Sequence, residues 1–330
     1  MTKNKKHQKP ILLRKLKNKK IGLAVSGGVD SMVLLDIFFN ISKEHNLKLY
    51  VMHYNHKWRK ESFKDARLVE KYCKENKIKF LYGGNKGEII SAKDGPASGG
   101  KDEATAREQR YSFFTTCARK FSLKVICTAH HRDDQLETVL FRLARGTGPN
   151  GLVPIKEFRE LPGGITIFRP LLDFTKGQIY KYAKENELKY IEDKTNRDVN
   201  YKRNLIRVKI LPLLRKINPE AENNILTFSD LAYSQYIALS NYFSMLLKKI
   251  RIRSPLILNR DKFLKLDSCT QTAFIYWFFT VYGIKGALSK IHVIKNAITN
   301  QKKIDLSKKY IMNVTGNEIM FSIKLSCYET

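Results

Sequence analysis

Short apolar runs alternate with longer amphipathic segments between residues 21 and 145. The runs have the length and composition of buried strands, whereas the segments between them carry apolar residues at helical spacing. This alternation predicts right-handed crossovers and an α/β fold, a parallel sheet with helices on both faces. The predicted strands are 21–26, 47–54, 78–83 and 124–130, and the predicted helices are 31–42, 61–77, 103–121 and 133–145.

The pattern changes beyond Pro212, where long helical periodicity takes over. A helix is predicted over 220–249, a buried aromatic helix over 274–284 and a strand pair within 303–323. The aromatic run is shorter than the roughly 20 residues that a membrane-spanning helix needs, so no membrane association is expected. We therefore expect a basic, partly disordered lead-in at 1–20, an α/β domain at 21–214 and a smaller, mainly helical domain at 215–330.

The net charge indicates a polyanionic partner. The chain has 61 Lys and Arg against 31 Asp and Glu, a formal net charge of +30. Nucleic acid is the leading candidate, and the alternative is a lysine-rich proteome in which every protein is basic. The surplus is +21 before residue 211 and +9 from there on, so we expect a polyanion to contact both parts.

The five cysteines form no recognisable framework. Their number is odd and no two stand in a CxxC pair, which argues against a disulfide scaffold, a zinc ribbon and a dithiol redox site. We therefore expect a reducing, cytoplasmic compartment. The first 20 residues carry nine Lys or Arg and no long apolar core, so they do not resemble a signal peptide.

The segment Ser26-Gly27-Gly28-Val29-Asp30-Ser31 joins the first predicted strand to the first predicted helix. Backbone N–H groups and the helix dipole make such a junction an anion site. The two glycines permit backbone geometry and a close approach that a Cβ would block, and the two serines add hydroxyl donors. A carboxylate at Asp30 fits beside phosphate only where it holds Mg²⁺ or orients the loop. We therefore expect a phosphate-binding loop, and the alternative is a plain strand-to-helix turn.

Two other glycine-rich stretches fit phosphate binding less well. Gly95–Asp102 begins like a Walker A loop, but Asp102 stands where that motif has the Mg²⁺-binding Ser or Thr. Gly146–Gly151 matches GxGxxG, but it follows a predicted helix instead of a strand. We therefore expect a chance match in the first stretch and a structured turn in the second.

Several motifs together resemble those of one enzyme family. SGGVDS resembles the PP-loop of ATP pyrophosphatases, and AHHRDDQLET at 129–138 resembles the AHHxxDQxET signature of tRNA(Ile)-lysidine synthases. The 83–101 loop, and Trp58 where a smaller residue is usual, depart from the family pattern. Further matches, in order, are HYNH at 53–56, RGTG at 145–148 with GL at 151–152, RPLL at 169–172, EDKTN at 192–196 and YKRNLIR at 201–207.

The resemblance implies a function. Members of this family use ATP to adenylate the C2 oxygen of the wobble cytidine in a minor isoleucine tRNA with a CAU anticodon. The side-chain amine of free L-lysine then displaces AMP and gives lysidine, so that the anticodon reads AUA instead of AUG. The resemblance thus implies that residues 21–214 are a PP-loop ATP-binding catalytic domain and that ATP is a co-substrate together with Mg²⁺. The basic surplus beyond residue 211 leads us to expect that residues 215–330 bind tRNA.

The resemblance also implies roles for single residues around the nucleotide. Ser26, Gly27, Gly28, Val29, Asp30 and Ser31 would bind ATP, with Asp30 catalytic and holding Mg²⁺. Arg110, on one helix face with Arg107, would steady the α-phosphate, and the alternative is two solvated arginines. His130 follows a parallel strand, where such sheets bind ligands, and would touch phosphate or assist proton transfer. The alternative at the two adjacent histidines is a zinc site, which lacks a third histidine and nearby cysteines.

Asp134 and Glu137 lie three residues apart on one face of a predicted helix, and their carboxylates would hold the ammonium of free lysine. The alternative is stabilisation of the helix N-terminus, which suits Asp134 better. Arg203 and Arg207 are four residues apart and would grip tRNA phosphates. The attacking amine must be neutral although its ordinary pKa is about 10.4, and the sequence does not indicate which group takes up its proton.

Three other classes of protein compete with this interpretation. A tRNA thiolase of the same superfamily would adenylate a similar base oxygen, but it needs paired cysteines for sulfur transfer. PP-loop synthetases of small molecules explain neither the net charge nor the AHHRDDQLET block, and a non-enzymatic RNA-binding module does not explain the ATP-site residues. We expect the C-terminal domain to bind the same tRNA at a second surface. The alternatives are that this domain packs against the first domain or forms a homodimer.

Overall fold

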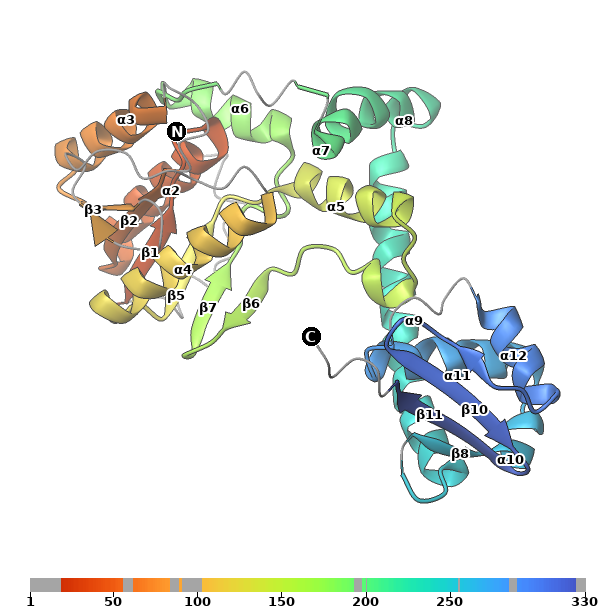
Figure 1. Ribbon diagram of the computed structural model, residues 1–330. Helices are drawn as coiled ribbons and strands as arrows, with labels where there is room; N and C mark the ends of the chain where they lie inside the picture. Colours follow the sequence, from red (N-terminus) through yellow and green to blue (C-terminus); the bar gives the residue numbers. More distant parts are fainter. Residues whose placement is uncertain are drawn as a thin grey trace. The chain divides into compact units, whose positions relative to one another are not determined.

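The computed structural model describes residues 19–55, 62–83, 89–90, 103–192, 198–199, 201–254, 256–284 and 290–324. The chain divides into two compact units, Met1–Asp230 and Leu231–Thr330 (Figure 1). The division falls inside helix α9 (Ala221–Ile250), later than the expected position at 215, because Ile225 and Leu226 of α9 pack into the first unit. Most of the lead-in at 1–20, most of the 83–101 loop and the Walker-like stretch lie outside the described residues.

The first unit is built on a mostly parallel sheet, as predicted. Its strand order is β4-β3-β2-β1-β5-β7-β6, in which only the edge strands β4 and β6 run antiparallel to their neighbours. The order reverses between β1 and β5, and such a switch point is where open α/β sheets bind ligands. The strands are β1 (Lys20–Ala24), β2 (Lys48–Tyr54), β3 (Lys79–Gly83), β4 (Ile89–Ile90), β5 (Val125–Thr128), β6 (Phe158–Leu161) and β7 (Ile165–Phe168).

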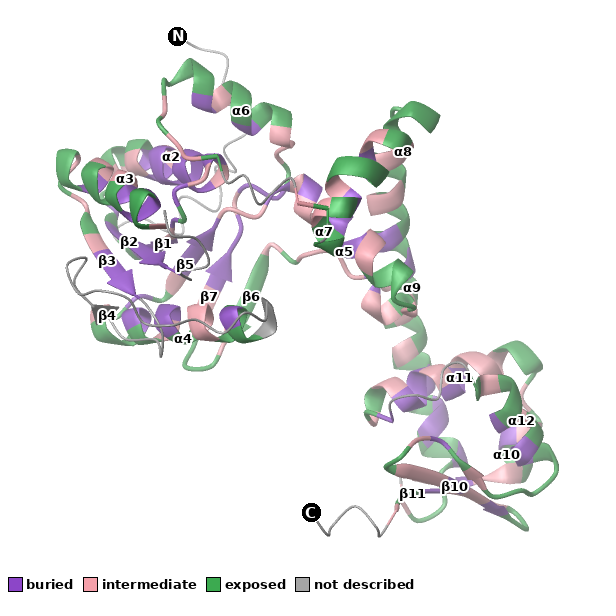
Figure 2. Ribbon diagram, turned by 45° about the horizontal axis from the view of Figure 1, so that its top comes forward, coloured by how far each residue is buried: buried purple, intermediate pink, exposed green. Residues whose placement is uncertain are grey.

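Helices cover both faces of this sheet (Figure 2). Apolar residues of α2, α3 and α6 form one core cluster with β1 and β2, and apolar residues of α4 form another with β2, β5 and β7 on the opposite face. The four predicted helices correspond to α2 to α5, and the GxGxxG stretch forms a single 3₁₀ turn at Pro149–Gly151, as expected. The bounds are α2 (Val29–His45), α3 (Ser62–Glu75), α4 (Glu103–Phe121), α5 (Arg132–Ala144) and α6 (Lys176–Glu185).

A buried carboxylate joins α6 to α2 and α3. Asp36 of α2 accepts hydrogen bonds from the hydroxyls of Tyr72 on α3, at 2.8 Å, and Tyr182 on α6, at 2.9 Å. Burial, followed by the neighbouring Asp36, raises the pKa of both phenols, so they remain neutral donors. The N-terminus of α6 is thereby held near the carboxyl end of β1.

The last part of the first unit packs on α5. Leu136 of α5, Ile206 and Leu211 form a small buried cluster with the first turns of α9. This packing brings the side chain of Arg207 to the face of α5. The segment consists of α7 (Lys202–Leu205), a π-helical stretch at Ile206–Ile210 and α8 (Leu211–Ile217).

The second unit combines helices with a small antiparallel sheet of order β8-β11-β10-β9. The predicted aromatic helix is α11, whose Phe274, Trp277 and Phe278 are buried in the core. No helix of the described residues is long and apolar enough to cross a membrane. The elements are α10 (Arg260–Leu264), α11 (Ser268–Val281), α12 (Ile291–Thr299), β8 (Ile257–Asn259), β9 (Ile304–Asp305), β10 (Tyr310–Thr315) and β11 (Glu318–Ile323).

Candidate active site

The predicted phosphate loop follows β1 in a tightly closed conformation. Gly27 has φ +95°, and a Cβ there would lie 3.2–3.3 Å from atoms of Asp65. The Ser31 hydroxyl accepts hydrogen bonds from the backbone N–H groups of Ser26 and Gly27, both at 3.1 Å, and donates to the Gly28 carbonyl at 2.9 Å. Ser31 therefore stabilises the loop by hydrogen bonds within it. The N-terminus of α2 has no side-chain cap, so its backbone N–H groups remain available to bind an anion.

Neighbouring segments hold this loop from outside. The His53 imidazole on β2 donates from Nδ1 to the carbonyl of Val25 at 2.9 Å, and the N–H of Ile191 donates to the carbonyl of Gly27 at 3.0 Å. Burial lowers the pKa of His53 to about 4, although this hydrogen bond acts in the opposite direction. The imidazole is therefore a neutral structural donor, and the HYNH motif at 53–56 supports the loop through its first residue.

Changing Gly27 to alanine is expected to destabilise the first unit by about 1–3 kcal/mol, because a Cβ meets both the left-handed backbone and Asp65. Gly28→Ala is the matched control. Gly28 has ordinary backbone angles, and the nearest atom to a new Cβ there is 3.7 Å away. Urea unfolding of both variants measures the difference, and equal losses of stability would contradict the assignment of the strain to Gly27.

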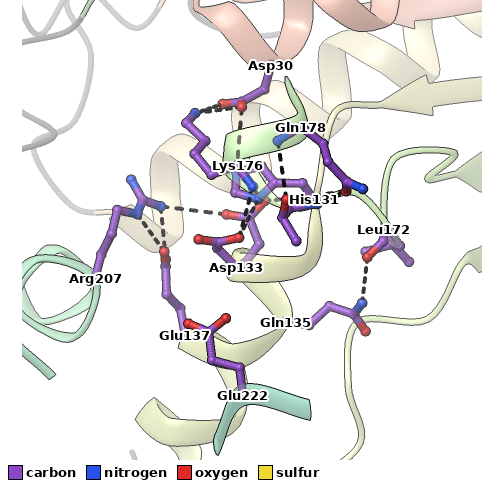
Figure 3. Close-up of polar contacts among 12 residues, drawn as sticks. Asp30, His131, Asp133, Gln135, Glu137, Leu172, Lys176, Gln178, Arg207 and Glu222 are labelled. Carbon is purple, nitrogen blue, oxygen red and sulfur yellow. Dashed lines mark hydrogen bonds and ion pairs between the residues drawn. The ribbon is translucent and has the colours of Figure 1, made fainter. Parts of the chain in front are cut away.

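Asp30, in the first turn of α2, is paired with a lysine that sequence analysis did not single out. Lys176 Nζ lies 2.6 Å from Oδ1 and 2.8 Å from Oδ2 of Asp30 (Figure 3). Lys176 is the first residue of α6, so the N-terminus of this helix meets the phosphate loop. Thr175 and Gln178 form a capping box there, which marks the start of a helix in sequence. Nothing in the sequence places that start beside a residue 146 positions earlier.

His131 occupies the centre of the site, between the loop and α5. Its Nε2 lies 3.7 Å from Oδ1 of Asp30 and 3.6 Å from Oδ2 of Asp134, and its Nδ1 lies 3.7 Å from Oδ1 of Asp133. Burial lowers the pKa of His131, but the three carboxylates together outweigh burial and raise the pKa above its usual value. His131 thus links the phosphate loop to the carboxylates of α5, which favour its charged form.

The predicted acidic pair on α5 is brought together by Arg207. Arg207 donates to both carboxylate oxygens of Glu137, at 2.5 and 3.0 Å, and its Nη2 lies 3.6 Å from Oδ1 of Asp134 (Figure 3). Glu137 is 2% exposed. Burial raises the pKa of this carboxyl, and Arg207 opposes the shift. Asp134 also accepts the N–H of His131 at 2.9 Å, so it serves the helix N-terminus as well.

Asp133 links the same cluster to the later helices. Its Oδ1 accepts the backbone N–H of Lys176 at 3.2 Å, and its Oδ2 lies 3.5 Å from Nη2 of Arg215. Arg215 in turn pairs with Glu222 at 2.6 Å. Asp133, Lys176 and Arg215 were missed in the sequence because their contacts join three helices that are far apart along the chain.

The other predicted residues lie around this cluster. His130 is half-buried, with Nδ1 2.9 Å from the Thr128 hydroxyl, and burial followed by nearby arginines, among them Arg110, lowers its pKa to about 3. His130 is therefore neutral and lies on the arginine side of the site, whereas its neighbour His131 contacts the carboxylates. Arg203 is exposed. Across the described residues, no three His, Cys, Asp or Glu form a group suited to a metal ion, and the zinc alternative gains no support.

Comparison with known proteins identifies the family. Residues 1–214 match the family model of the PP-loop domain. The chain is 30% identical over 312 residues to tRNA(Ile)-lysidine synthase of Francisella tularensis subsp. novicida, covering 93% of this chain and 75% of that protein. The chain belongs to the tRNA(Ile)-lysidine synthase family. The family member from a Thermotoga species is 39% identical over 203 residues, which cover 62% of this chain and 47% of that protein.

Among solved structures, the chain is similar to the U34-tRNA thiolase NcsA of Methanococcus maripaludis. The TM-score is 0.53 at 17% sequence identity, covering 67% of this chain and 76% of the thiolase. At this identity the similarity concerns the fold alone, and it confirms the predicted PP-loop architecture. Membership of the lysidine synthase family makes this chain an enzyme of tRNA modification that uses ATP.

Proposed function

We propose that this chain ligates free L-lysine to C2 of the wobble cytidine in a tRNA(Ile) with a CAU anticodon. The observation that carries the proposal is the position of His131, within 3.7 Å of both Asp30 on the phosphate loop and Asp134 of the acidic pair. A site for nucleotide phosphates and a site for an ammonium therefore adjoin at one edge of the sheet. An amine that attacks an adenylated base needs this adjacency.

The reaction has two displacements. The C2 oxygen of cytidine attacks the α-phosphorus of ATP, and pyrophosphate leaves. The ε-nitrogen of lysine then attacks C2, the C2–O bond breaks, and AMP leaves with that oxygen while the nitrogen gives up protons. We assign the phosphates to the N–H groups at the start of α2, and Arg110 to the α-phosphate, because preorganised donors stabilise the charge that develops on phosphate oxygens.

We assign the lysine ammonium to Asp134 and Glu137. Glu137 is almost fully buried and offers its charge to a cation at short range, as its bidentate contact with Arg207 illustrates. Arg207 lies among the carboxylates, so we assign it to this site and keep Arg203, which is exposed, as the tRNA contact of the pair. Arg207 then positions the two carboxylates for the substrate.

Asp30 fits a Mg²⁺ ion that arrives with ATP. This cation is usually held by one or two carboxylates together with substrate phosphates and water. Both oxygens of Asp30 contact the Lys176 ammonium, so a cation already lies where the ion would bind. When bound, the ion would supply positive charge next to the phosphates, and Lys176 would be released from Asp30.

We also propose that both units contact the tRNA. The anticodon bases would be recognised unstacked, because helical RNA grooves expose little sequence information. The basic surplus continues into the second unit, where Lys302 and Lys303 are exposed.

Changing both Lys302 and Lys303 to alanine is expected to weaken tRNA binding and to reduce its dependence on salt concentration, because fewer phosphates are neutralised. Filter binding at several salt concentrations measures both effects.

A tRNA thiolase is the alternative, and the cysteines argue against it. Cys73, Cys117 and Cys127 are buried, and burial raises the pKa of each thiol, to about 12 for Cys73 and Cys117. A sulfur carrier needs an accessible thiolate. Cys269 is exposed but lies in the second unit, outside the PP-loop match, and Cys327 is outside the described residues.

The decisive experiment follows pyrophosphate release from ATP. We expect release that requires tRNA and that continues over many turnovers only when lysine is present, together with incorporation of labelled lysine into a transcript with a CAU anticodon. A transcript with cytidine replaced by uridine at the wobble position is the control and should stay unlabelled. Incorporation of sulfur from a persulfide donor, without any lysine requirement, would favour the thiolase.

A further inference from the structure

A second cluster of positive charge surrounds Tyr111 on α4. The guanidinium carbons of Arg107, Arg159 and Arg110 lie 5.1, 5.5 and 5.9 Å from the centre of the Tyr111 ring. Arg107 and Arg110 come from α4, whereas Arg159 comes from the edge strand β6. Such an arrangement concentrates like charges around one aromatic side chain, and it is stable where an anion offsets their repulsion.

Arg169 completes the cluster and lacks a counter-ion. It directly follows β7 and is 3% exposed. Its Nη1 donates to the carbonyl of Lys156 at 2.7 Å, whereas its Nε has no hydrogen-bond partner among the described residues. The Tyr111 hydroxyl lies close enough to interact with the guanidinium, and none of the described carboxylates forms an ion pair with it. A buried charge with an unused donor is costly unless a ligand supplies the missing partner.

The cluster is electrostatically strained in the structure. Burial lowers the pKa of Arg169, Tyr111 acts in the opposite direction, and Arg159 and Arg107 lower the pKa further. Arg169, Arg110 and Arg107 likewise lower the pKa of His130. An added negative charge would raise the pKa of both groups.

The cluster shares an edge of the sheet with the phosphate loop. Ala24 of β1 pairs with Thr128 of β5, and Cys127 of β5 pairs with Phe168 of β7, all in parallel register. The carboxyl ends of these three strands therefore lie side by side. Because neighbouring strands are about 4.8 Å apart, Arg169 is displaced by roughly 10 Å along the edge from the loop after β1.

We propose that Arg107, Arg159 and Arg169 form a phosphate site separate from the Ser26–Ser31 loop, and that it receives a backbone phosphodiester of the RNA beside the modified base. The inference rests on the proposed function. Guanidinium groups match phosphate oxygens with paired donors. Arg107 and Arg159 are exposed, so a macromolecule can reach them, while buried Arg169 provides a fixed donor behind them. Contacts of this kind set the register of a nucleic acid without selecting its sequence.

The test compares binding of tRNA with binding of a non-hydrolysable ATP analogue. Arg159→Ala and Arg107→Ala are each expected to lower the slope of log affinity against log salt by about one. Arg169→Lys is expected to weaken tRNA binding roughly tenfold, because it keeps the charge but loses the fork of donors. The affinity for the ATP analogue should stay unchanged in all three. Arg119→Ala, an exposed arginine in the last turn of the same helix, is the control and should leave tRNA affinity unchanged.

Unchanged tRNA affinity in the three variants would overturn the inference. So would a loss of affinity for the ATP analogue with tRNA affinity intact, since the site would then belong to the nucleotide. Thermal unfolding checks the fold, and if Arg169→Lys does not fold, the two exposed variants decide the outcome. If the proposed function is wrong, the unaltered chain will release no pyrophosphate in the presence of tRNA and lysine. If only the inference about the arginines is wrong, the unaltered chain will still release it.

Discussion

Replacing Asp30 with alanine is expected to reduce tRNA- and lysine-dependent pyrophosphate release by about 100-fold or more. Asp30 lies at the start of α2, where we place the phosphates and the Mg²⁺ ion, and loss of one group that stabilises developing charge commonly costs two to three orders of magnitude. Stability should change little, because Asp30 and Lys176 are each about 30% exposed on their side chains and such pairs contribute about 0–1 kcal/mol.

The measurement is pyrophosphate release at saturating tRNA, with urea unfolding in parallel. Glu44→Ala is the matched control, since Glu44 is an exposed acidic residue near the other end of α2. Full activity of Asp30→Ala would remove Asp30 from the catalytic machinery. A variant that is both inactive and unfolded would show that the Lys176 contact is structural.

Changing Glu137 to glutamine is expected to raise the KM for lysine by roughly 10- to 100-fold. A hydrogen bond to a charged group contributes about 1.5–3 kcal/mol, and the substitution removes the charge while keeping the shape. The KM for ATP should stay the same, because we assign the nucleotide contacts to the loop and to Arg110 of α4, and not to α5. Steady-state kinetics with each substrate varied in turn provides both constants.

Glu108→Gln, an exposed position on α4, is the control for this measurement and should change neither constant. If the KM for ATP rises in Glu137→Gln while the KM for lysine stays constant, the acidic pair serves ATP or its metal ion. The parallel variant Asp134→Asn is expected to have a smaller effect on lysine, since Asp134 also accepts the N–H of His131.

Periodicity predicted the central architecture well, and it failed where elements are short or exposed. The helix predicted over 103–121 coincides with α4, because its apolar residues recur at helical spacing and are buried. Strand β6 was not predicted, since its four residues are almost all exposed and show no apolar alternation. The first strand of the small sheet, β8, was also missed, because its three residues are too few to show an alternation.

The site was predicted in its parts but not in its connections. The strand–SGGVDS–helix order locates the loop, and the spacing of Asp134 and Glu137 places both on one face of α5. The sequence does not separate the two histidines, because adjacent residues beyond a strand point in different directions and only the fold decides which meets Asp30. No local sequence pattern could predict the contact between Lys176 and Asp30, because it depends on the packing of α6 against α2.

The contacts of Lys176 and Arg207 have a consequence for how a charged amino acid would enter. An ammonium already neutralises Asp30, and a guanidinium already neutralises Glu137, so the carboxylates are never buried alone. Because Arg207 stays paired with Glu137, an entering ammonium would meet a carboxylate that is already partly neutralised. The affinity for a cationic substrate is then expected to be lower than an unpaired carboxylate would give.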